Sequence, residues 1–338
     1  MKAWAVTQPG PIDGEQPPIK LIEKPIPVPQ RGEVLVKVLT CGVCHTDLHV
    51  TEGDLPVHQP NVTPGHEIVG KVVTLGPDTL RFKVGERIGI PWFRQACGVC
   101  KFCRSGHENL RPHSKYTGWD HDGGYAEYVT VPEGFAYRIP DQFNSLEVAP
   151  LLCAGIIGYR AYRRANIPPG GRLGLYGFGG SAHITAQIAL AQGVEVHVFT
   201  RGPDAQKFAL KLGCKSANGA YDLPPVPLDS SIIFSPAGPM VIPALEGLIP
   251  GGTLALAGIH MSDVPTLNYQ KHLFHEKVVT SVESNTRRDG EEFLVLAERL
   301  KIHPQVTEYP FEKADEALKK VKHGDIKGAC VLRISNDE

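Results

Sequence analysis

The sequence lacks an excess of charge of either sign and lacks any long hydrophobic run. Thirty-five Lys and Arg residues stand against thirty-six Asp and Glu residues, which gives a formal net charge of -1. Without a basic arm or stripe, this composition argues against a nucleic-acid partner. No apolar run approaches the roughly 20 residues that a membrane-spanning helix needs, so we expect no membrane association.

The chain also lacks a recognisable export signal. Its first residues, MKAWAVTQPGP, do not contain the apolar core of a signal peptide, and we therefore expect a cytoplasmic protein. Eight cysteines in such a chain of 338 residues indicate metal ligands or buried thiols rather than a disulfide framework.

The length and a change of pattern along the chain predict two domains. Before about residue 150, helical periodicity is scarce, and runs such as 33–40, 66–76 and 125–132 are typical of β-strands. From Glu147 to about Ser281, strand-like and helix-like segments alternate, which predicts a parallel sheet with helices on both faces. Two amphipathic helices and a strand-like CVLRI follow, and this tail can return to the first domain.

A nucleotide-binding pattern opens the alternating region. In YGFGGSAH, Gly177, Gly179 and Ala182 form G-x-G-x-x-A directly after a strand and at the start of a helix, with Gly180 and Ser181 between them. The first glycine permits a tight turn and the second lets the backbone approach a pyrophosphate. The small third residue lets the helix pack closely on the strand. We interpret the segment as a dinucleotide-binding loop.

The end of the next strand bears on which dinucleotide binds. An NAD site usually has an Asp or Glu there for the ribose 2′-hydroxyl, but this strand ends in Thr200 and Arg201. Arg201 can pair with a 2′-phosphate and Thr200 can donate a hydrogen bond to it. The sequence therefore favours NADP(H). Asp204 lies close by, and an NAD(H)-preferring protein remains the alternative.

Another group of residues has the side chains that hold a metal and move a proton. PGHEIVG supplies His66 and Glu67, APLLCAG supplies Cys153, and CGVCHTDLH (41–49) supplies two cysteines. Two thiolates and an imidazole would make a zinc site with an open fourth position, and such a zinc can polarise an alcohol oxygen. Asp47 could accept a hydrogen bond from the metal-bound imidazole, while Thr46 and His49 could pass a proton to solvent.

These residues also have plainer interpretations. Cys153 could be a small buried apolar residue, as we interpret Cys41, and His66 could be a hydrogen-bonded interior histidine. Their joint occurrence with a nucleotide-binding loop favours the metal site.

A second cysteine cluster is one ligand short. Cys97, Cys100 and Cys103 have the spacing of thiolates around a metal, but Arg111 stands where a fourth cysteine would be convenient. His107 or His113 could complete the site, the three thiolates could hold zinc with a water or an outside ligand, or the lobe could be empty. A guanidinium cannot ligate zinc because it has no free lone pair. We expect an empty or weakly loaded lobe.

Together these motifs resemble those of zinc-dependent alcohol dehydrogenases of the medium-chain dehydrogenase/reductase superfamily. CGVCHTDLH, GHEIVG, CGVCKFC, LLCAGIIGY and YGFGGSAH occur in the family's order over essentially the whole chain. The resemblance implies a GroES-like catalytic domain made of 1–153 and 284–338, with a Rossmann cofactor-binding domain, 154–283, between its parts. Cys153 favours the alcohol branch, because related polyol dehydrogenases often carry Glu there. The region around LLCAG is also close to the NADP-using cinnamyl-alcohol-dehydrogenase-like branch.

The resemblance also implies roles for individual residues. Leu55 and Trp119 add apolar side chains to the substrate pocket that it implies. The residues carried over are Cys44, His66 and Cys153 as ligands of the catalytic zinc, Glu67 beside the zinc, Thr46 and His49 in the proton relay, His45 near the pyrophosphate, and Trp92 and Phe93 in the pocket.

From these motifs we expect reversible hydride transfer between NADP(H) and an alcohol/aldehyde pair, with primary alcohols as substrates. We expect about one zinc per chain, and members of this length lead us to expect a tetramer. A non-catalytic NADPH-binding protein would predict an incomplete ligand set. A nucleic-acid-binding zinc module is disfavoured by the missing fourth ligand and the neutral charge.

Overall fold

The structure is a computed structural model that describes residues 1–337, and the chain divides into two compact units. Unit 1 consists of Met1–Ala154, Ser284–Glu298 and the described part of His303–Glu338, and unit 2 consists of Gly155–Glu283 and Arg299–Ile302. Among residues 1–337, no helix has both the length and the apolar character needed to cross a bilayer.

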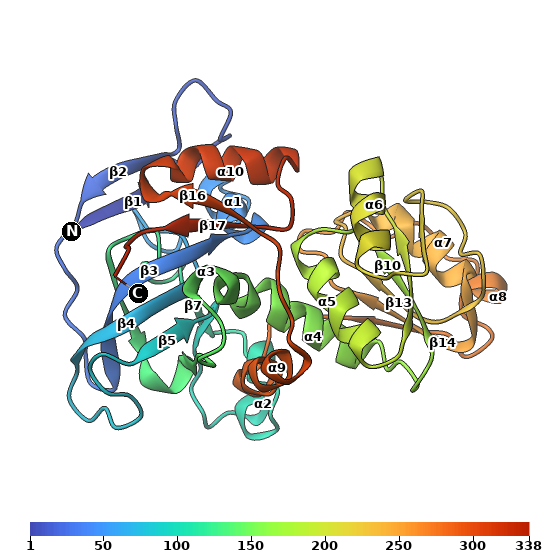
Figure 1. Cartoon of the computed structure of the whole chain (residues 1–338), viewed down its shortest axis with the longest axis horizontal. Helices are drawn as coiled ribbons and strands as arrows, with labels where there is room; N and C mark the ends of the chain where they lie inside the picture. Colours follow the sequence, from blue (N-terminus) through green and yellow to red (C-terminus); the bar gives the residue numbers. More distant parts are fainter. Residues whose placement is uncertain (338) are drawn as a thin grey trace. The chain divides into compact units, whose positions relative to one another are not determined.

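Unit 1 is built on a mostly antiparallel sheet (Figure 1). Its strands run in the order β16-β17-β3-β4-β5-β9, and β8 also pairs with β3. The long central strand β3 therefore has the C-terminal β17 as one neighbour and β4 as the other. The strands are β3 (Glu33–Val43), β4 (Glu67–Leu75), β5 (Arg87–Ile90), β8 (Tyr128–Pro132), β9 (Tyr137–Arg138), β16 (Val306–Pro310) and β17 (Ala329–Arg333).

Two small hairpin-like pairs and several helices complete this unit. The pairs are β1 (Lys2–Val6) with β2 (Ile19–Glu23), and β6 (Phe93–Gln95) with β7 (Lys115–Tyr116). The helices are α1 (His45–Glu52), α2 (Lys101–Arg104), α3 (Ser145–Val148), α9 (Arg287–Leu300) and α10 (Ala314–His323), with 3₁₀ turns η1 (Glu108–Leu110), η2 (Glu133–Phe135), η3 (Ala149–Leu152) and η5 (Phe311–Lys313).

Unit 2 is a six-stranded, all-parallel sheet in the order β12-β11-β10-β13-β14-β15. Numbered within the unit, this order is 3-2-1-4-5-6, the strand order of a Rossmann fold. The strands are β10 (Arg172–Tyr176), β11 (Glu195–Phe199), β12 (Ser216–Asn218), β13 (Leu228–Ile233), β14 (Leu248–Leu256) and β15 (Val278–Ser281); the helices are α4 (Ala154–Arg164), α5 (Gly180–Ala191), α6 (Pro203–Lys211), α7 (Val241–Glu246) and α8 (Tyr269–His272), with the 3₁₀ turn η4 (Gly238–Met240).

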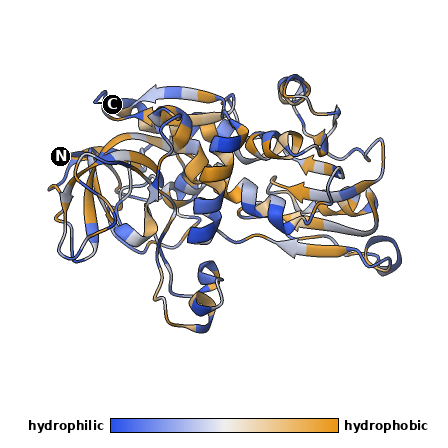
Figure 2. Cartoon of the chain, turned by 60° about the horizontal axis from the view of Figure 1, so that its bottom comes forward, coloured by the Kyte–Doolittle hydropathy of each residue, from blue (hydrophilic) through white to orange (hydrophobic). Residues whose placement is uncertain are grey.

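Each unit has its own hydrophobic core. In unit 2, Leu173 and Leu175 face one apolar cluster, whereas Tyr176 and Ile233 belong to a second cluster. A sheet that buries both faces is what the near-continuous apolar strands of this region predict. Figure 2 shows the hydrophobic colouring concentrated on the strands, while many loops are hydrophilic.

The predicted fold class, a Rossmann sheet plus a β-rich GroES-like domain, is confirmed. The strand expected at 33–40 continues to Val43, and that expected at 125–132 begins only at Tyr128. The segment before Tyr128 pairs elsewhere, because the Tyr125 N–H donates to the Pro64 carbonyl and Ala126 bridges to Ala3.

Candidate functional site

Four side chains from three separate places along the chain of unit 1 converge on one point. Cys44 lies between β3 and α1, His66 and Glu67 lie at the start of β4, and Cys153 lies between η3 and α4. One ligand atom from each of the four lies within 4.8 Å of all the others. The Cys44 Sγ is 3.2 Å from the His66 Nε2. We call these four residues the metal cluster, because thiolate and imidazole are ligands that zinc prefers.

Asp47 holds two residues of the metal cluster, His66 and Cys44, in place by hydrogen bonds. It is 1% exposed, and its Oδ1 lies 2.9 Å from the His66 Nδ1. The same oxygen accepts from the Gly65 N–H, while Oδ2 accepts from the Cys44 N–H and the Tyr125 hydroxyl. The carboxylate therefore holds the imidazole with its Nε2 towards Cys44, an arrangement typical of metal-binding histidines.

The electrostatics of the metal cluster favour a thiolate at Cys44. A hydrogen bond from Cys153 and the nearby His66 lower the pKa of Cys44 well below its ordinary value, although burial opposes this. Burial disfavours a charged His66, but the charges of Asp47 and Cys44 raise its pKa well above the usual value. Burial, followed by the charge of Cys44, raises the pKa of Glu67 well above its ordinary value.

The Glu67 carboxyl group fills the space that the absence of a side chain at Gly42 leaves open. Gly42, in β3, pairs directly with Glu67 across the sheet. A Cβ at Gly42 would lie 1.7 Å from the Glu67 Oε2, so only glycine leaves room for this carboxyl group. Nothing in the sequence pattern pointed to Gly42.

The residues predicted to move the proton lie on α1. Thr46 is 5% exposed, and its N–H donates to the Cys44 Sγ over 3.3 Å. His49 lies three residues further along the helix, with its Nδ1 2.7 Å from the Asp54 carboxylate. Sequence reasoning missed Asp54, which follows the helix directly. His45, at the first position of α1, is exposed.

The four residues predicted for the substrate pocket fall into three places. The Trp92 ring meets the His66 ring edge-on at 5.0 Å and stacks on Trp119 at 5.9 Å. Trp119 and Leu55 line a cavity of about 250 Å³. Phe93 is 1% exposed and packs on Tyr116 and Phe135, and its place in the substrate pocket stays a prediction.

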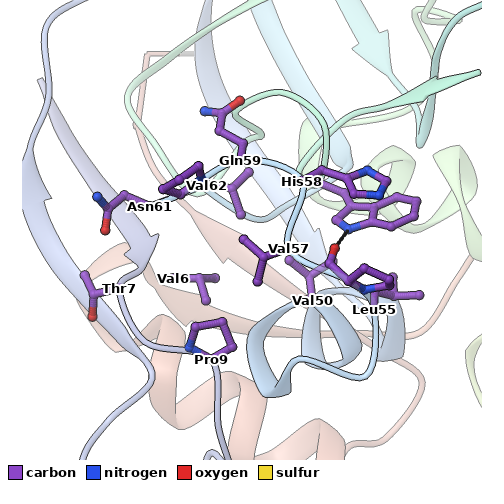
Figure 3. A pocket seen from close by; sticks show the side chains of 13 residues that line it. Val6, Thr7, Pro9, Val50, Leu55, Val57, His58, Gln59, Asn61 and Val62 are labelled. Atoms are coloured by element: carbon purple, nitrogen blue, oxygen red, sulfur yellow. Dashed lines mark hydrogen bonds between the residues drawn. The ribbon is translucent and has the colours of Figure 1, made fainter.

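A stacked pair of rings forms part of the wall of the cavity. His58 lies flat over the indole of Trp119, with ring centroids 4.0 Å apart (Figure 3). The Trp119 Nε1 donates to the Pro56 carbonyl, and the His58 Nδ1 lies 3.0 Å from the Asp120 carboxylate. His58 was not predicted, since no spacing links residues 62 positions apart.

The predicted nucleotide loop lies in unit 2, between β10 and α5. Gly177 has φ of +86°, and Gly179 is the N-cap of α5. A Cβ at Gly179 would meet no atom within 4 Å, so the space above the helix start is open. Ala182 is fully buried, while Gly180 and Ser181 are half-buried in the first turn. Backbone N–H groups at such a helix start attract anions.

The end of β11 carries the residues that bear on cofactor choice. Thr200 is 8% exposed, and its N–H donates to the Asn218 carbonyl. Arg201 is exposed, and within residues 1–337 its guanidinium has no hydrogen-bond or ion-pair partner.

The second cysteine cluster comes together without a fourth ligand. The Sγ of Cys103 lies 3.6 Å from that of Cys100 and 3.9 Å from that of Cys97. In the described part of the chain, neither His107 nor His113 joins this group of ligand atoms. Hydrogen bonds from the backbone of Val99 and of Cys100, and one from the Arg111 side chain, lower the pKa of Cys97 to about 6.

Comparison with known proteins places these features in a family. Residues 30–141 match the alcohol dehydrogenase GroES-like domain. The probable alcohol dehydrogenase AdhA of Mycobacterium tuberculosis is 56% identical over 339 residues, covering 99% of this chain and 97% of the relative.

Two solved structures superimpose over nearly their full lengths. CAD from Helicobacter pylori, complexed with NADP(H), has a TM-score of 0.86 at 25% identity and covers 100% of this chain and 99% of its own. A thermostable alcohol dehydrogenase from Pyrobaculum aerophilum with bound cobalt and zinc has a TM-score of 0.88 at 25% identity and covers 99% of both chains.

The identity to a probable alcohol dehydrogenase over almost the whole chain confirms the resemblance seen in the motifs. The protein is thus an oxidoreductase acting on alcohols, and it belongs to the zinc-dependent alcohol dehydrogenases of the medium-chain dehydrogenase/reductase superfamily.

Proposed function

We propose that the protein transfers a hydride reversibly between NADP(H) and an apolar primary alcohol or its aldehyde, with one catalytic zinc per chain. The observation that carries this proposal is the convergence of the metal cluster, whose ligand atoms lie within 4.8 Å of one another. Two thiols and an imidazole fit zinc with one position left for substrate. When bound there, zinc supplies Lewis-acid polarisation of the substrate oxygen.

The chain's own residues hold this centre in shape. Asp47 keeps a proton on the His66 Nδ1 and so leaves the Nε2 lone pair free for a metal. The hydrogen bond from Cys153 and the nearby His66 lower the pKa of Cys44, which favours its thiolate form. Glu67 adds an oxygen at the edge of the cluster and, because burial raises its pKa, can stay protonated.

We assign proton movement to α1. Thr46 is buried beside Cys44, and His49 lies one helical turn away towards the surface. Asp54, at 46% side-chain exposure, contacts His49 and can pass the proton on to water. The hydroxyl and imidazole are suited to this relay because each can both donate and accept a proton.

The preference for NADP(H) is supported by Arg201. It follows β11 where an NAD site would carry an acid, and its guanidinium is exposed and unpaired within residues 1–337. The similar Helicobacter pylori protein was solved with NADP(H). We also propose His45, Thr200 and the 177–182 loop as cofactor contacts.

Replacing Arg201 with Asp tests this preference. The loss of a charge-assisted bond to the 2′-phosphate, worth about 1.5–3 kcal/mol, should lower the NADP/NAD ratio of kcat/KM about 10- to 150-fold. Arg201→Gln, which removes the cation without adding an anion, is the matched control and should shift the ratio less. An unchanged ratio in Arg201→Asp would place the 2′-phosphate elsewhere and favour the NAD(H) alternative.

The aromatic row beside the metal cluster supports an apolar substrate. Trp92, at the edge of His66, continues through Trp119 to Leu55, and these surfaces offer few polar groups to a ligand. A primary alcohol would place its hydroxyl at the metal cluster and its apolar chain along this row.

The decisive experiment combines elemental analysis with turnover. Purified protein should contain about one zinc per chain and should reduce aldehydes with NADPH, whereas Cys44→Ala should lose zinc and activity but keep NADPH binding. Cys214→Ala, at a buried thiol in unit 2, is the control and should keep both. Zinc-loaded protein that turns over no primary alcohol or aldehyde would refute the proposal.

We further propose a cytoplasmic homo-oligomer, most simply a tetramer. β15 is an edge strand paired only with β14, and its Val278 and Val279 are exposed, at 48% and 38%. Tyr269 and Phe274 are also exposed in this part of the chain. An unpaired apolar edge invites pairing with a second copy. Light scattering of the purified protein would give the number of chains directly.

A further inference from the structure

The three thiols outside the metal cluster are placed to react with one another. The Cys103 Sγ lies 3.6 Å from the Cys100 Sγ and 3.9 Å from the Cys97 Sγ, so Cys103 is within contact distance of both. A disulfide needs a sulfur separation near 2.05 Å, which side-chain rotation can supply once the thiols are in contact.

Backbone hydrogen bonds in and after α2 position two of these thiols. Cys100 is the N-cap of α2 and Cys103 lies inside that helix. The Cys100 carbonyl accepts from the Arg104 N–H at 3.0 Å, and the Phe102 carbonyl accepts from the His107 N–H at 2.8 Å. These hydrogen bonds fix the backbone that carries Cys100 and Cys103.

An ion pair anchors the far end of this segment. Glu108, 5% exposed, accepts from the Arg287 backbone N–H at 2.9 Å and from the Arg287 Nη2 at 2.7 Å. Arg287 is the first residue of α9. The segment is fixed to unit 1 by this contact.

Among residues 1–337, no fourth metal-ligating side chain lies with the three thiols. Arg111 reaches Cys97 and also donates to the His113 carbonyl, and a guanidinium cannot bind a metal ion. Positive charge near a thiol instead favours its reactivity, and Lys101 and Arg104 add two more exposed cations to the segment.

Accessibility separates these thiols from the others. Cys41, Cys214 and Cys330 are buried, and Cys44 and Cys153 belong to the metal cluster. Cys97 is exposed, and Cys100 and Cys103 are half-buried. Of the eight cysteines, this trio alone is both open to a reagent in solution and close to further thiols outside the metal cluster.

We propose that Cys97, Cys100 and Cys103 form a redox-active thiol site in which a hydroperoxide oxidises Cys103 and a neighbouring cysteine to a disulfide. Cys97, the most exposed, attacks the outer peroxide oxygen; the O–O bond breaks, an alcohol or water leaves, and Cys97 becomes a sulfenic acid. The Cys103 thiol then attacks that sulfur, the S–O bond breaks, and the leaving hydroxide takes up the thiol proton and departs as water. Two electrons pass from the two thiols to the hydroperoxide.

The third thiol, Cys100, allows a second disulfide, Cys100–Cys103, to replace the first one. Cys100, 3.6 Å from Cys103, can attack the new bond and displace Cys97 by thiol–disulfide exchange. Cys97 is then free again. The site is independent of the proposed hydride transfer, since none of its residues belongs to the metal cluster.

Peptide mapping of the zinc-containing full chain tests the proposal. The protein is treated with hydrogen peroxide, free thiols are alkylated, and the chain is cut after Lys and Arg. Cys97 and Cys100 then lie in fragment 95–101, whereas Cys103 lies alone in fragment 102–104. A disulfide that includes Cys103 joins these two fragments, and the expected result is that reducible joined product.

Three variants assign the steps. Cys103→Ser should give no joined product and should confine the oxidation to fragment 95–101, as a Cys97–Cys100 disulfide or as a Cys97 sulfenic acid that a cyclic 1,3-diketone captures. Cys100→Ser should still form the joined product, whereas Cys97→Ser should form it at least about tenfold more slowly. An equal rate in Cys97→Ser would overturn the role of Cys97.

Two further results would overturn the site as a whole. One is complete alkylation of all three thiols after peroxide treatment of the unaltered chain, a measurement that does not depend on any variant folding. The other is a second, peroxide-resistant zinc that protects them. Oxidation of Cys44 or Cys153 would appear in other fragments, so a failure here is distinguishable from a failure of the proposed alcohol chemistry.

Discussion

Replacing Asp47 with Asn should weaken zinc binding by the metal cluster about 10- to 100-fold. Asp47 is 1% exposed, and its oxygens accept from the N–H groups of Cys44 and Gly65, the imidazole of His66 and the hydroxyl of Tyr125. An amide has a single oxygen. If that oxygen stays with Gly65 and His66, the Cys44 N–H faces an NH₂ group.

The cost follows from this count of donors. A buried N–H without an acceptor costs about 1–3 kcal/mol, and the Asn side chain also loses the negative charge that holds the imidazole. A 10- to 100-fold loss of zinc affinity corresponds to about 1.4–2.8 kcal/mol, which is the same range. Asp47 orients the His66 ring so that its Nε2 faces the metal position, so its replacement should lower the zinc affinity directly.

Competition with a zinc chelator gives the Kd, and thermal unfolding of metal-free protein separates metal affinity from folding. Tyr125→Phe is the control, because it removes one donor to the same carboxylate and leaves the charge; its zinc Kd should change less than about threefold. A wild-type Kd and kcat in Asp47→Asn would refute the idea that Asp47 orients His66.

Three other changes test separate parts of the structure. Gly42→Ala should lower kcat at least about tenfold, because its Cβ would displace the Glu67 carboxyl; kcat equal to wild type would count against a role for that group. Burial opposes ionisation of Glu108, but hydrogen bonds from Arg287 lower its pKa below 4.5. The ionised Glu108 therefore contributes fully to stability above pH 4.5, and this contribution is lost as the pH falls through the lower pKa of the folded state. Chemical unfolding at several pH values should therefore show a steeper loss of stability below pH 4.5 in wild type than in Glu108→Gln, and parallel curves would exclude this contribution. Arg111→Cys should add about one zinc per chain by elemental analysis; no gain would mean that the segment needs more than a fourth thiol.

Much of the fold could be predicted because the sequence patterns that indicate its strands, helices and glycine loop each span only a few residues. The alternation of strands and helices after Glu147 and the glycines of the nucleotide loop are each readable within a few residues, and both appear in unit 2. The residues of CVLRI contain no local signal for pairing with β3, so the pattern alone left the return of the tail as a possibility, and it was the family resemblance that assigned 284–338 to the same domain as 1–153.

The site was less accessible to sequence reasoning. His66 follows Cys44 by 22 residues, so the joint occurrence of ligand types and the family resemblance, rather than spacing, pointed to the metal cluster. The hydrogen bond expected between Asp47 and the imidazole is present. The stacking of His58 on Trp119 depends on tertiary packing, and no periodic pattern encodes it.

The pairing of β17 with β3 also sets an order of assembly on the ribosome. Cys330 lies opposite Val43 and Val331 opposite Gly42, so the strand that leads into Cys44 gains its second neighbour from residues synthesised almost 290 positions later. All strands of unit 2 lie within Arg172–Ser281 and emerge before it. The Rossmann unit can therefore fold while the chain is still being made. The cysteines and the histidine of the metal cluster are translated before β17. The sheet that supports Cys44 is nevertheless complete only when β17 has been synthesised and has paired with β3.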